Sequence, residues 1–202
     1  MVPQHPFDQS TYQVRFEWGV EGLARLAPAD IVVVVDVLGL SSAAIDAVEL
    51  GDILRADAEP AATALIAAAA NSAAAVLVGG IRNAGAVAAA VLTEQERRGV
   101  RTSVAVIAVG EPAGSSLRFT VEDLLGAGAV IAALAGRGID HSSPEAAAAC
   151  ESVRGLRRAT RHLLTASGSG RSLADRVDVV HAAAAADAST VVPVLRDGVF
   201  AA

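Results

Sequence analysis

The chain has 202 residues, the length of a single domain with a sizeable hydrophobic core. Hydrophobic residues make up 53% and charged residues 19% of the sequence, which excludes a disordered protein. The formal net charge of −6 provides no broad positive surface for a phosphate backbone, so we expect no nucleic-acid partner.

Two residue types are scarce enough to exclude whole classes of chemistry. All 16 basic residues are arginine, so there is no lysine for a Schiff base, a pyridoxal-phosphate enzyme or a P-loop. Cys150 is the single cysteine, which excludes an internal disulfide and a multi-cysteine zinc site. This cysteine usage fits a reducing compartment.

The sequence indicates neither secretion nor a membrane span. Residues 1–10 lack the positive and apolar regions of a signal peptide. Residues 61–81 are uncharged, but they are mostly alanine, which contributes little membrane affinity, and glycines interrupt them at 79 and 80. We therefore expect a cytoplasmic protein with no membrane contact.

Hydrophobic periodicity predicts alternating strands and helices through the first half of the chain. Residues 31–37 form a β-branched run, which is typical of a strand buried on both sides in a parallel sheet. In chain order we expect a strand at 12–18, a helix at 21–27, the strand at 31–37, a helix at 41–50, a weak strand at 53–56, a helix at 60–70, a strand at 75–78, a helix at 83–98 and a strand at 102–109.

The second half is predicted to be mainly helical. Thr120 and Asp123 form a variant of the capping box, which begins a helix that reaches about residue 135. Residues 143–145 supply an N-cap serine, a proline and an acid, so we expect one long helix from 143 to about 164. A loop at 165–170, a helix at 172–186 and an edge strand at 191–195, which carries Pro193, follow.

Strands that alternate with helices imply right-handed crossovers and layers packed on one sheet. No shift in composition marks a domain boundary along the chain. We therefore predict a single α/β domain over residues 1–202, with a three-layer α/β/α fold around a largely parallel or mixed central sheet.

Asp36 is the leading candidate for chemistry, because it lies near the carboxyl end of the most buried predicted strand. Open α/β sheets bind ligands outside these strand ends. A carboxylate there can hold a divalent cation or act as an acid or base, or it can simply cap the next helix. Ser41 and Ser42 begin that helix, where free backbone N–H groups bind anions, so they are predicted to bind substrate. Either serine is also a possible N-cap.

Further candidates follow two other predicted strands. Glu111 comes directly after the strand at 102–109, and Glu122 and Asp123 follow a polar loop. These acids can coordinate a metal, although the last two also favour a helix N-terminus through its dipole. Arg82 and Asn83 follow the strand at 75–78. Arg82 can bind a phosphate with two hydrogen bonds or remain a solvated surface residue, and Asn83 is either an N-cap or a ligand contact.

Six segments together resemble the 2-phosphosulfolactate phosphatase family. They are residues 9–23 (QSTYQVRFEWGVEGL), 32–43 (VVVVDVLGLSSA), 77–88 (LVGGIRNAGAVA), 104–111 (VAVIAVGE), 121–134 (VEDLLGAGAVIAAL) and 189–200 (STVVPVLRDGVF). VEDLLGAGA and VVPVLRDG are the most specific of these stretches. The resemblance implies an α/β/α layered fold and an Mg²⁺-dependent phosphatase that acts on a small anionic phosphate ester.

The resemblance also implies the site residues. Asp36, Asn83 and Glu111 are expected to be catalytic, and Asp36, Glu122 and Asp123 to hold Mg²⁺. Asn83 and backbone N–H groups would orient the ester, and Arg82, predicted together with Ser41 and Ser42 to bind substrate, would neutralise its charge.

Two departures from the family pattern support an alternative. The family's first motif often has Arg-Ala-Thr-Thr or Ser-Phe-Ser-Thr after Asp-Val-Leu, whereas Gly39 and Leu40 stand here. A glycine-rich stretch of the family is replaced between residues 54 and 77 by little more than one alanine-rich helix. The alternative is a catalytically degenerate member that binds an anionic metabolite, or acts as a subunit, without turnover.

The composition also leads us to expect a homodimer. Only 3% of the residues are aromatic, so the apolar surface is spread over many alanines and valines with shallow faces. A second copy often completes such faces through a two-fold interface. A specific interface would bury at least about 1,000 Å² in total, whereas in a monomer all alanine faces would point inward.

Overall fold

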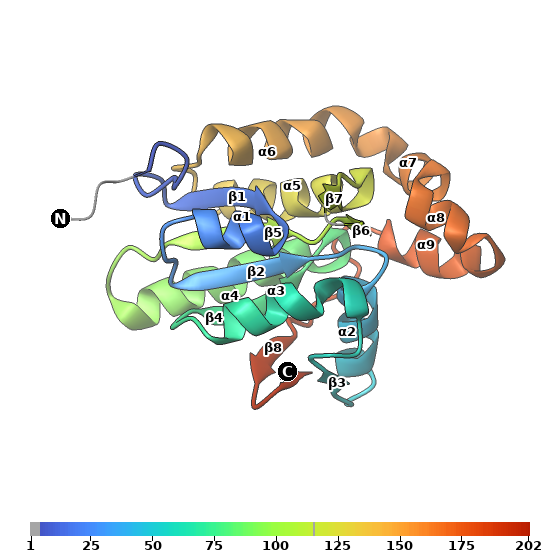
Figure 1. The fold of residues 1–202 in the computed structure, drawn as a ribbon, viewed down its shortest axis with the longest axis horizontal. Coiled ribbons are helices and arrows are strands. Elements are labelled where there is room, and N and C mark those ends of the chain that lie inside the picture. The colour runs from blue at the N-terminus through green and yellow to red at the C-terminus, as the bar shows by residue number, and fades with distance from the viewer. Residues whose placement is uncertain (1–4, 115) are drawn as a thin grey trace.

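The computed structural model describes residues 5–114 and 116–202, and a seven-stranded mixed sheet forms its middle layer (Figure 1). Four strands at one side of the sheet are parallel, and the remaining three extend it with antiparallel pairings. Across the sheet the strands lie in the order β1 (Val14–Trp18), β5 (Val104–Ala108), β2 (Ile31–Val35), β4 (Ala75–Gly79), β8 (Val194–Arg196), β9 (Val199–Ala201) and β3 (Leu54–Arg55).

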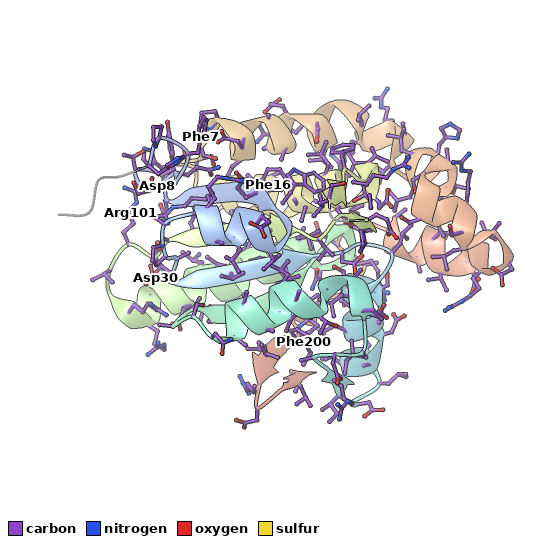
Figure 2. All side chains as sticks on the ribbon, in the orientation of Figure 1. Phe7, Asp8, Phe16, Asp30, Arg101 and Phe200 are labelled. Atoms are coloured by element: carbon purple, nitrogen blue, oxygen red, sulfur yellow. The ribbon has the colours of Figure 1, made fainter. Side chains whose placement is uncertain are left out.

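The two central strands are buried on both faces, as their continuous apolar sequences predict. All five residues of β2 and all five of β5 are buried. Because successive side chains point to opposite faces of a strand, Val33 and Val35 enter one hydrophobic core, whereas Val32 and Val34 enter the other. Phe200 of β9 belongs to this second core and is completely buried (Figure 2).

Helices cover both faces of the sheet, which confirms the predicted three-layer α/β/α fold. One face is covered by α4 (Ala84–Arg98), α5 (Val121–Ala135) and α6 (Pro144–Leu156). The other face is covered by α1 (Gly19–Arg25), α2 (Leu40–Glu49) and α3 (Pro60–Ala70). Short 3₁₀ turns precede α4, α7 and α9 at Ile81–Asn83, Arg157–Ala159 and Ala174–Arg176.

Two smaller units lie beyond the carboxyl ends of the parallel strands. One contains α7 (Thr160–Ala166), α8 (Gly168–Ser172) and α9 (Val177–Ala183), and Figure 1 shows it on the side toward which the arrows of β1 and β2 point. The other is a hairpin of β6 (Glu111–Ala113) and β7 (Ser116–Arg118) directly after β5. Both units therefore stand where an open α/β sheet binds its ligands.

Three predictions about the C-terminal half are wrong. The long helix ends at Leu156, where Gly155 weakens it and the Thr160 hydroxyl donates to the carbonyl of Arg157 at 3.1 Å. The helix predicted at 172–186 is instead the end of α8, a 3₁₀ turn and α9. Pro193 does not mark an edge strand, because it precedes β8 and its carbonyl accepts a hydrogen bond from the N–H of Val78 at 2.9 Å.

Within the described part of the chain, every helix is too short or too polar to cross a bilayer.

Candidate active site

Asp36 directly follows β2 and its side chain holds the start of α2. Its Oδ2 atom accepts a hydrogen bond from the N–H of Leu40 at 2.8 Å, and its own N–H donates to the Ser41 hydroxyl at 3.0 Å. Burial raises the pKa of Asp36 to about 6; the Leu40 hydrogen bond acts in the opposite direction, and the charges of Glu59 and Glu111 raise it further. The Asp36 carboxylate therefore lies near two other negatively charged side chains, Glu59 and Glu111.

Asp123 joins the first turn of α5 to the ends of two strands. One carboxylate oxygen accepts from the N–H of Val37 at 2.8 Å, and the other accepts from the N–H of Gly110 at 3.0 Å and the Thr120 hydroxyl at 2.8 Å. Burial raises its pKa to about 8, and the charge of Asp36 adds to this effect. Thr120 thus donates to the carboxylate of Asp123, and both oxygens of this carboxylate are engaged by protein donors.

A pocket of about 630 Å³ opens at this edge of the sheet. Its walls come from the β2–α2 turn, the residue before α3, the hairpin, the first turn of α5 and the segment around α8. The lining polar and charged residues are Asp36, Glu59, Glu111, Arg118, Thr120, Glu122, Asp123, Ser167, Ser169, Arg171 and Ser172.

Four of the predicted site residues meet in this pocket. Asp36, Glu111, Glu122 and Asp123 come from three chain segments that follow different strands, and all line the same cavity. Glu122 is buried, and among the described residues its carboxylate accepts no hydrogen bond. Their metal-binding and catalytic roles stay a prediction. Asp36 and Glu111 converge because β2 and β5 share one carboxyl edge, and the hairpin after β5 returns the chain to this edge at Glu122 and Asp123.

The other predicted residues lie outside this pocket. The Asn83 side chain is completely buried, accepts from the N–H of Gly80 and donates to the carbonyls of Val78 and Val191. Arg82 pairs with Asp46 at 2.6 Å and with Glu49 at 3.0 Å.

Ser41 and Ser42 are not N-caps, because Gly39 occupies that position and the serines lie in the first turn of α2. The Ser41 hydroxyl donates to the carbonyl of Gly79, and the Ser42 hydroxyl donates to the carbonyl of Val37. Both serines therefore fix the turn that carries Asp36.

Sequence reasoning missed the two arginines of the pocket. Among the described residues, neither the Arg118 nor the Arg171 guanidinium forms an ion pair or a hydrogen bond, and both line the cavity. Arg118 is the one basic residue of the polar loop at 110–120, a signal that was available in the sequence. Arg171 follows Gly-Ser-Gly at 168–170, a pattern that the rule for dinucleotide loops rejects because no strand precedes it.

The donor set of the pocket fits one mode of magnesium binding. Among residues 5–114 and 116–202, no three acidic, histidine or cysteine side chains come close enough together to form a protein cage for a metal ion. Mg²⁺ is commonly bound by one or two carboxylates together with waters and substrate phosphates. The carboxylates of Asp36 and Glu122 suit this open mode, because each has an oxygen that no described protein donor engages.

A comparison with protein families adds to this geometry. A family model described as 2-phosphosulpholactate phosphatase matches residues 60–198, which confirms the resemblance found in the sequence. The matched range includes the hairpin, the first turn of α5 and α8, and it begins after Asp36. No curated protein matches the chain.

Proposed function

Because this chain belongs to the 2-phosphosulpholactate phosphatase family, we propose that it hydrolyses a small anionic phosphate monoester in the pocket at the carboxyl edge of its sheet. One observation carries this proposal: the pocket holds carboxylates together with two guanidinium groups that have no partner among the described residues. Such a pocket can bind a cation and an anion side by side.

Arg118 and Arg171 bind the phosphate. A guanidinium donates two parallel hydrogen bonds to phosphate oxygens and stays charged at any physiological pH. The two arginines stand on different elements, the hairpin and α8, so they can approach the phosphate from two sides of the pocket. They partly offset the negative charge of the five carboxylates along the same walls.

Asp36 and Glu122 hold the magnesium ion. When bound, Mg²⁺ polarises the phosphoryl group and neutralises its developing negative charge. Asp123 keeps the ends of β2 and β5 in place through the N–H groups of Val37 and Gly110. In this arrangement Asp123 is a positioning residue, and Asn83 and Ser41 support the neighbouring strand end from outside the pocket.

Glu111 moves the proton that hydrolysis requires. Water attacks the phosphorus, the bond between phosphorus and the ester oxygen breaks, and the alcohol leaves with a proton. Glu111 is exposed at the mouth of the pocket, and among the described residues it forms no ion pair. It can therefore exchange protons with water and with the leaving group.

A panel of small phosphate monoesters, assayed with and without Mg²⁺, tests the proposal. We expect release of phosphate that depends on Mg²⁺ and a loss of kcat by about a hundredfold or more in Asp36→Asn. Asp178→Asn is the matched control, because Asp178 is exposed on α9 and does not line the pocket. Inactivity of the folded wild-type protein toward every ester with Mg²⁺ present would contradict the proposal.

Binding without turnover is the second candidate function. It is favoured by the engagement of Asp36, whose carboxylate packs directly against Gly39, the first position at which the sequence departs from the family's motif. Calorimetry distinguishes the two functions. Saturable binding of a phosphate ester, with no hydrolysis of the same ester, would identify a degenerate family member.

A further inference from the structure

We propose that Leu117 is a positioning residue that docks the β6–β7 hairpin onto the body of the domain and thereby holds Arg118 in the pocket. The anion-binding role of Arg118 rests on the proposed function. The docking itself rests on contacts of Leu117 with two backbone positions that contain no side chain.

Two glycines form a notch that accepts the Leu117 side chain. A Cβ atom added to Gly19 would lie 2.5 Å from Leu117 Cδ1, and one added to Gly110 would lie 2.7 Å from Leu117 Cδ2. Gly19 begins α1 directly after β1, and Gly110 lies between β5 and β6. Each has a positive φ, +60° and +69°, which other residues rarely adopt. The leucine therefore fits between two strand ends because both lack a side chain.

The hairpin has few other means of holding its place. All six residues of its two strands are exposed, so it has no buried core of its own. Phe119, which follows β7, packs against Trp18 in a tilted arrangement with ring centroids 5.1 Å apart, and Trp18 directly precedes Gly19. Leu117 and Phe119 are thus the apolar anchors of the hairpin, and Arg118 lies between them.

The alternation of side chains along β7 connects the anchor to the pocket. Neighbouring residues of a strand point to opposite faces, so the docking of Leu117 directs Arg118 away from the notch. Arg118 lines the pocket and lies directly opposite Glu111 in the register of the hairpin. Glu111 is the residue to which we assign proton transfer. The docking of Leu117 therefore fixes the positions of both the Arg118 guanidinium and the Glu111 carboxylate at the mouth of the pocket.

Four variants separate positioning from general stability. Leu117→Ala removes the side chain that fills the notch between Gly19 and Gly110, and Leu117→Met retains an apolar side chain of similar volume. Leu50→Ala is the matched control, because Leu50 is a leucine 86% exposed at the end of α2 and lies outside the pocket. Arg118→Gln removes the positive charge that Leu117 is proposed to hold in the pocket.

The first measurement is trypsin cleavage of the native protein after Arg118, followed by mass spectrometry. Leu117→Ala is expected to be cleaved faster at this bond than the wild type, Leu117→Met and Leu50→Ala. This measurement does not depend on phosphatase activity.

The second measurement is the KM of the best phosphate ester. Arg118→Gln is expected to raise it by about tenfold or more, which corresponds to the loss of one charge-assisted pair of hydrogen bonds. Leu117→Ala is expected to raise the KM by less than Arg118→Gln does, and Leu117→Met is expected to keep the KM of the wild type. In a protein that already carries Arg118→Gln, Leu117→Ala should cause no further increase in KM.

If the wild type hydrolyses no ester, the proposed phosphatase function is wrong, but the positioning role of Leu117 is still testable. The affinity for inorganic phosphate is then measured for each variant instead of the KM. The positioning role is overturned if trypsin cleaves Leu117→Ala after Arg118 at the same rate as the wild type. It is also overturned if Leu117→Ala weakens binding by the same factor whether or not Arg118 is present.

Discussion

Asp30 forms several polar contacts outside the pocket. It lies directly before β2, at the end of the strand opposite to the pocket (Figure 2). One oxygen accepts from the N–H and the hydroxyl of Ser103, at 2.8 and 2.6 Å, and the other accepts from Arg98 at 2.8 Å. These contacts connect the beginnings of β2 and β5 to the end of α4.

The stability of the fold is therefore expected to depend on the ionisation of Asp30. Burial raises its pKa, but the Ser103 hydrogen bonds and the charge of Arg98 lower it more, so the pKa lies below its ordinary value of 3.8. A lowered pKa stabilises the fold above the ordinary value, and this contribution is lost as the pH falls through the folded value. Asp30→Asn should thus destabilise the protein near pH 7, and this destabilisation should diminish as the pH falls below 3.8.

Urea denaturation of wild type and Asp30→Asn at a series of pH values measures this difference. Asp178→Asn serves again as the control, because Asp178 is exposed and, among the described residues, its side chain forms no hydrogen bond. A destabilisation by Asp30→Asn that stays constant from neutral to acidic pH would contradict the assignment.

At the scale of elements, α5 and α6 pack closely against each other. Gly128 of α5 faces the backbone of Ala149 in α6, and a Cβ atom at this glycine would clash with the Ala149 carbonyl oxygen. A backbone carbonyl in a helix cannot rotate away, so the two helices would have to move apart. The glycine is what permits this separation of the two helices.

Gly128→Ala and Gly155→Ala should therefore change stability in opposite directions. Gly128→Ala is expected to lower the free energy of unfolding by about 1–3 kcal/mol through overpacking. Gly155 is exposed on α6 with open space around its Cα, so Gly155→Ala should raise the free energy by about 0.5–1 kcal/mol. Chemical denaturation measures both values, and equal effects of the two substitutions would show that α5 and α6 adapt freely.

The elements that sequence predicts well are those with their own local signals. The β-branched run of β2 and the proline that begins α3 place these elements in the predicted positions. The break after Leu156 is hard to predict because a single glycine, Gly155, is a weak signal for a helix end, and helical structure resumes at Thr160. The hairpin at 111–118 is hidden because its exposed strands of three residues carry no hydrophobic pattern.

The candidate site divides in the same manner. The convergence of Asp36 and Glu111 is predictable, because each follows a parallel strand whose carboxyl end lies at one edge of the sheet. Glu122 and Asp123 reach the same edge because α5 begins shortly after the β6–β7 hairpin, which itself follows β5. The polar loop at 110–120 marks Arg118 as a candidate, but the places of Arg118 and Arg171 in the pocket depend on how the hairpin and α8 pack onto that edge. Arg82 has the right chemistry for a phosphate, but Asp46 and Glu49 already occupy its guanidinium.

At the scale of the whole molecule, the expected homodimer remains a prediction. Leu50 and Ile53 are exposed by 86% and 54%, beside the antiparallel end of the sheet. A hollow of about 580 Å³, lined by one side of α3, by alanines before and after this helix and by the β8–β9 hairpin, opens near the same end. Apolar side chains and a hollow of this kind are features that a second copy can cover.

Light scattering at micromolar concentration tests this expectation. A dimer would give about twice the chain mass of 20.3 kDa, and Leu50→Asp with Ile53→Asp should reduce it to the mass of a monomer if the interface includes this end of the sheet. A wild-type mass of 20.3 kDa would contradict the dimer.

The strand order also determines when the protein can fold during its synthesis. β1 and β2 both pair with β5, so neither has this neighbour until residue 108 has left the ribosome. β3 pairs with β9, which lies about 145 residues further along the chain and ends at residue 201. Pairings between such distant segments form slowly. In the newly made N-terminal half, the valine-rich β2 can pair with β4 but not yet with β5, so one edge of β2 stays open. This is a stage at which a chaperone can protect the chain.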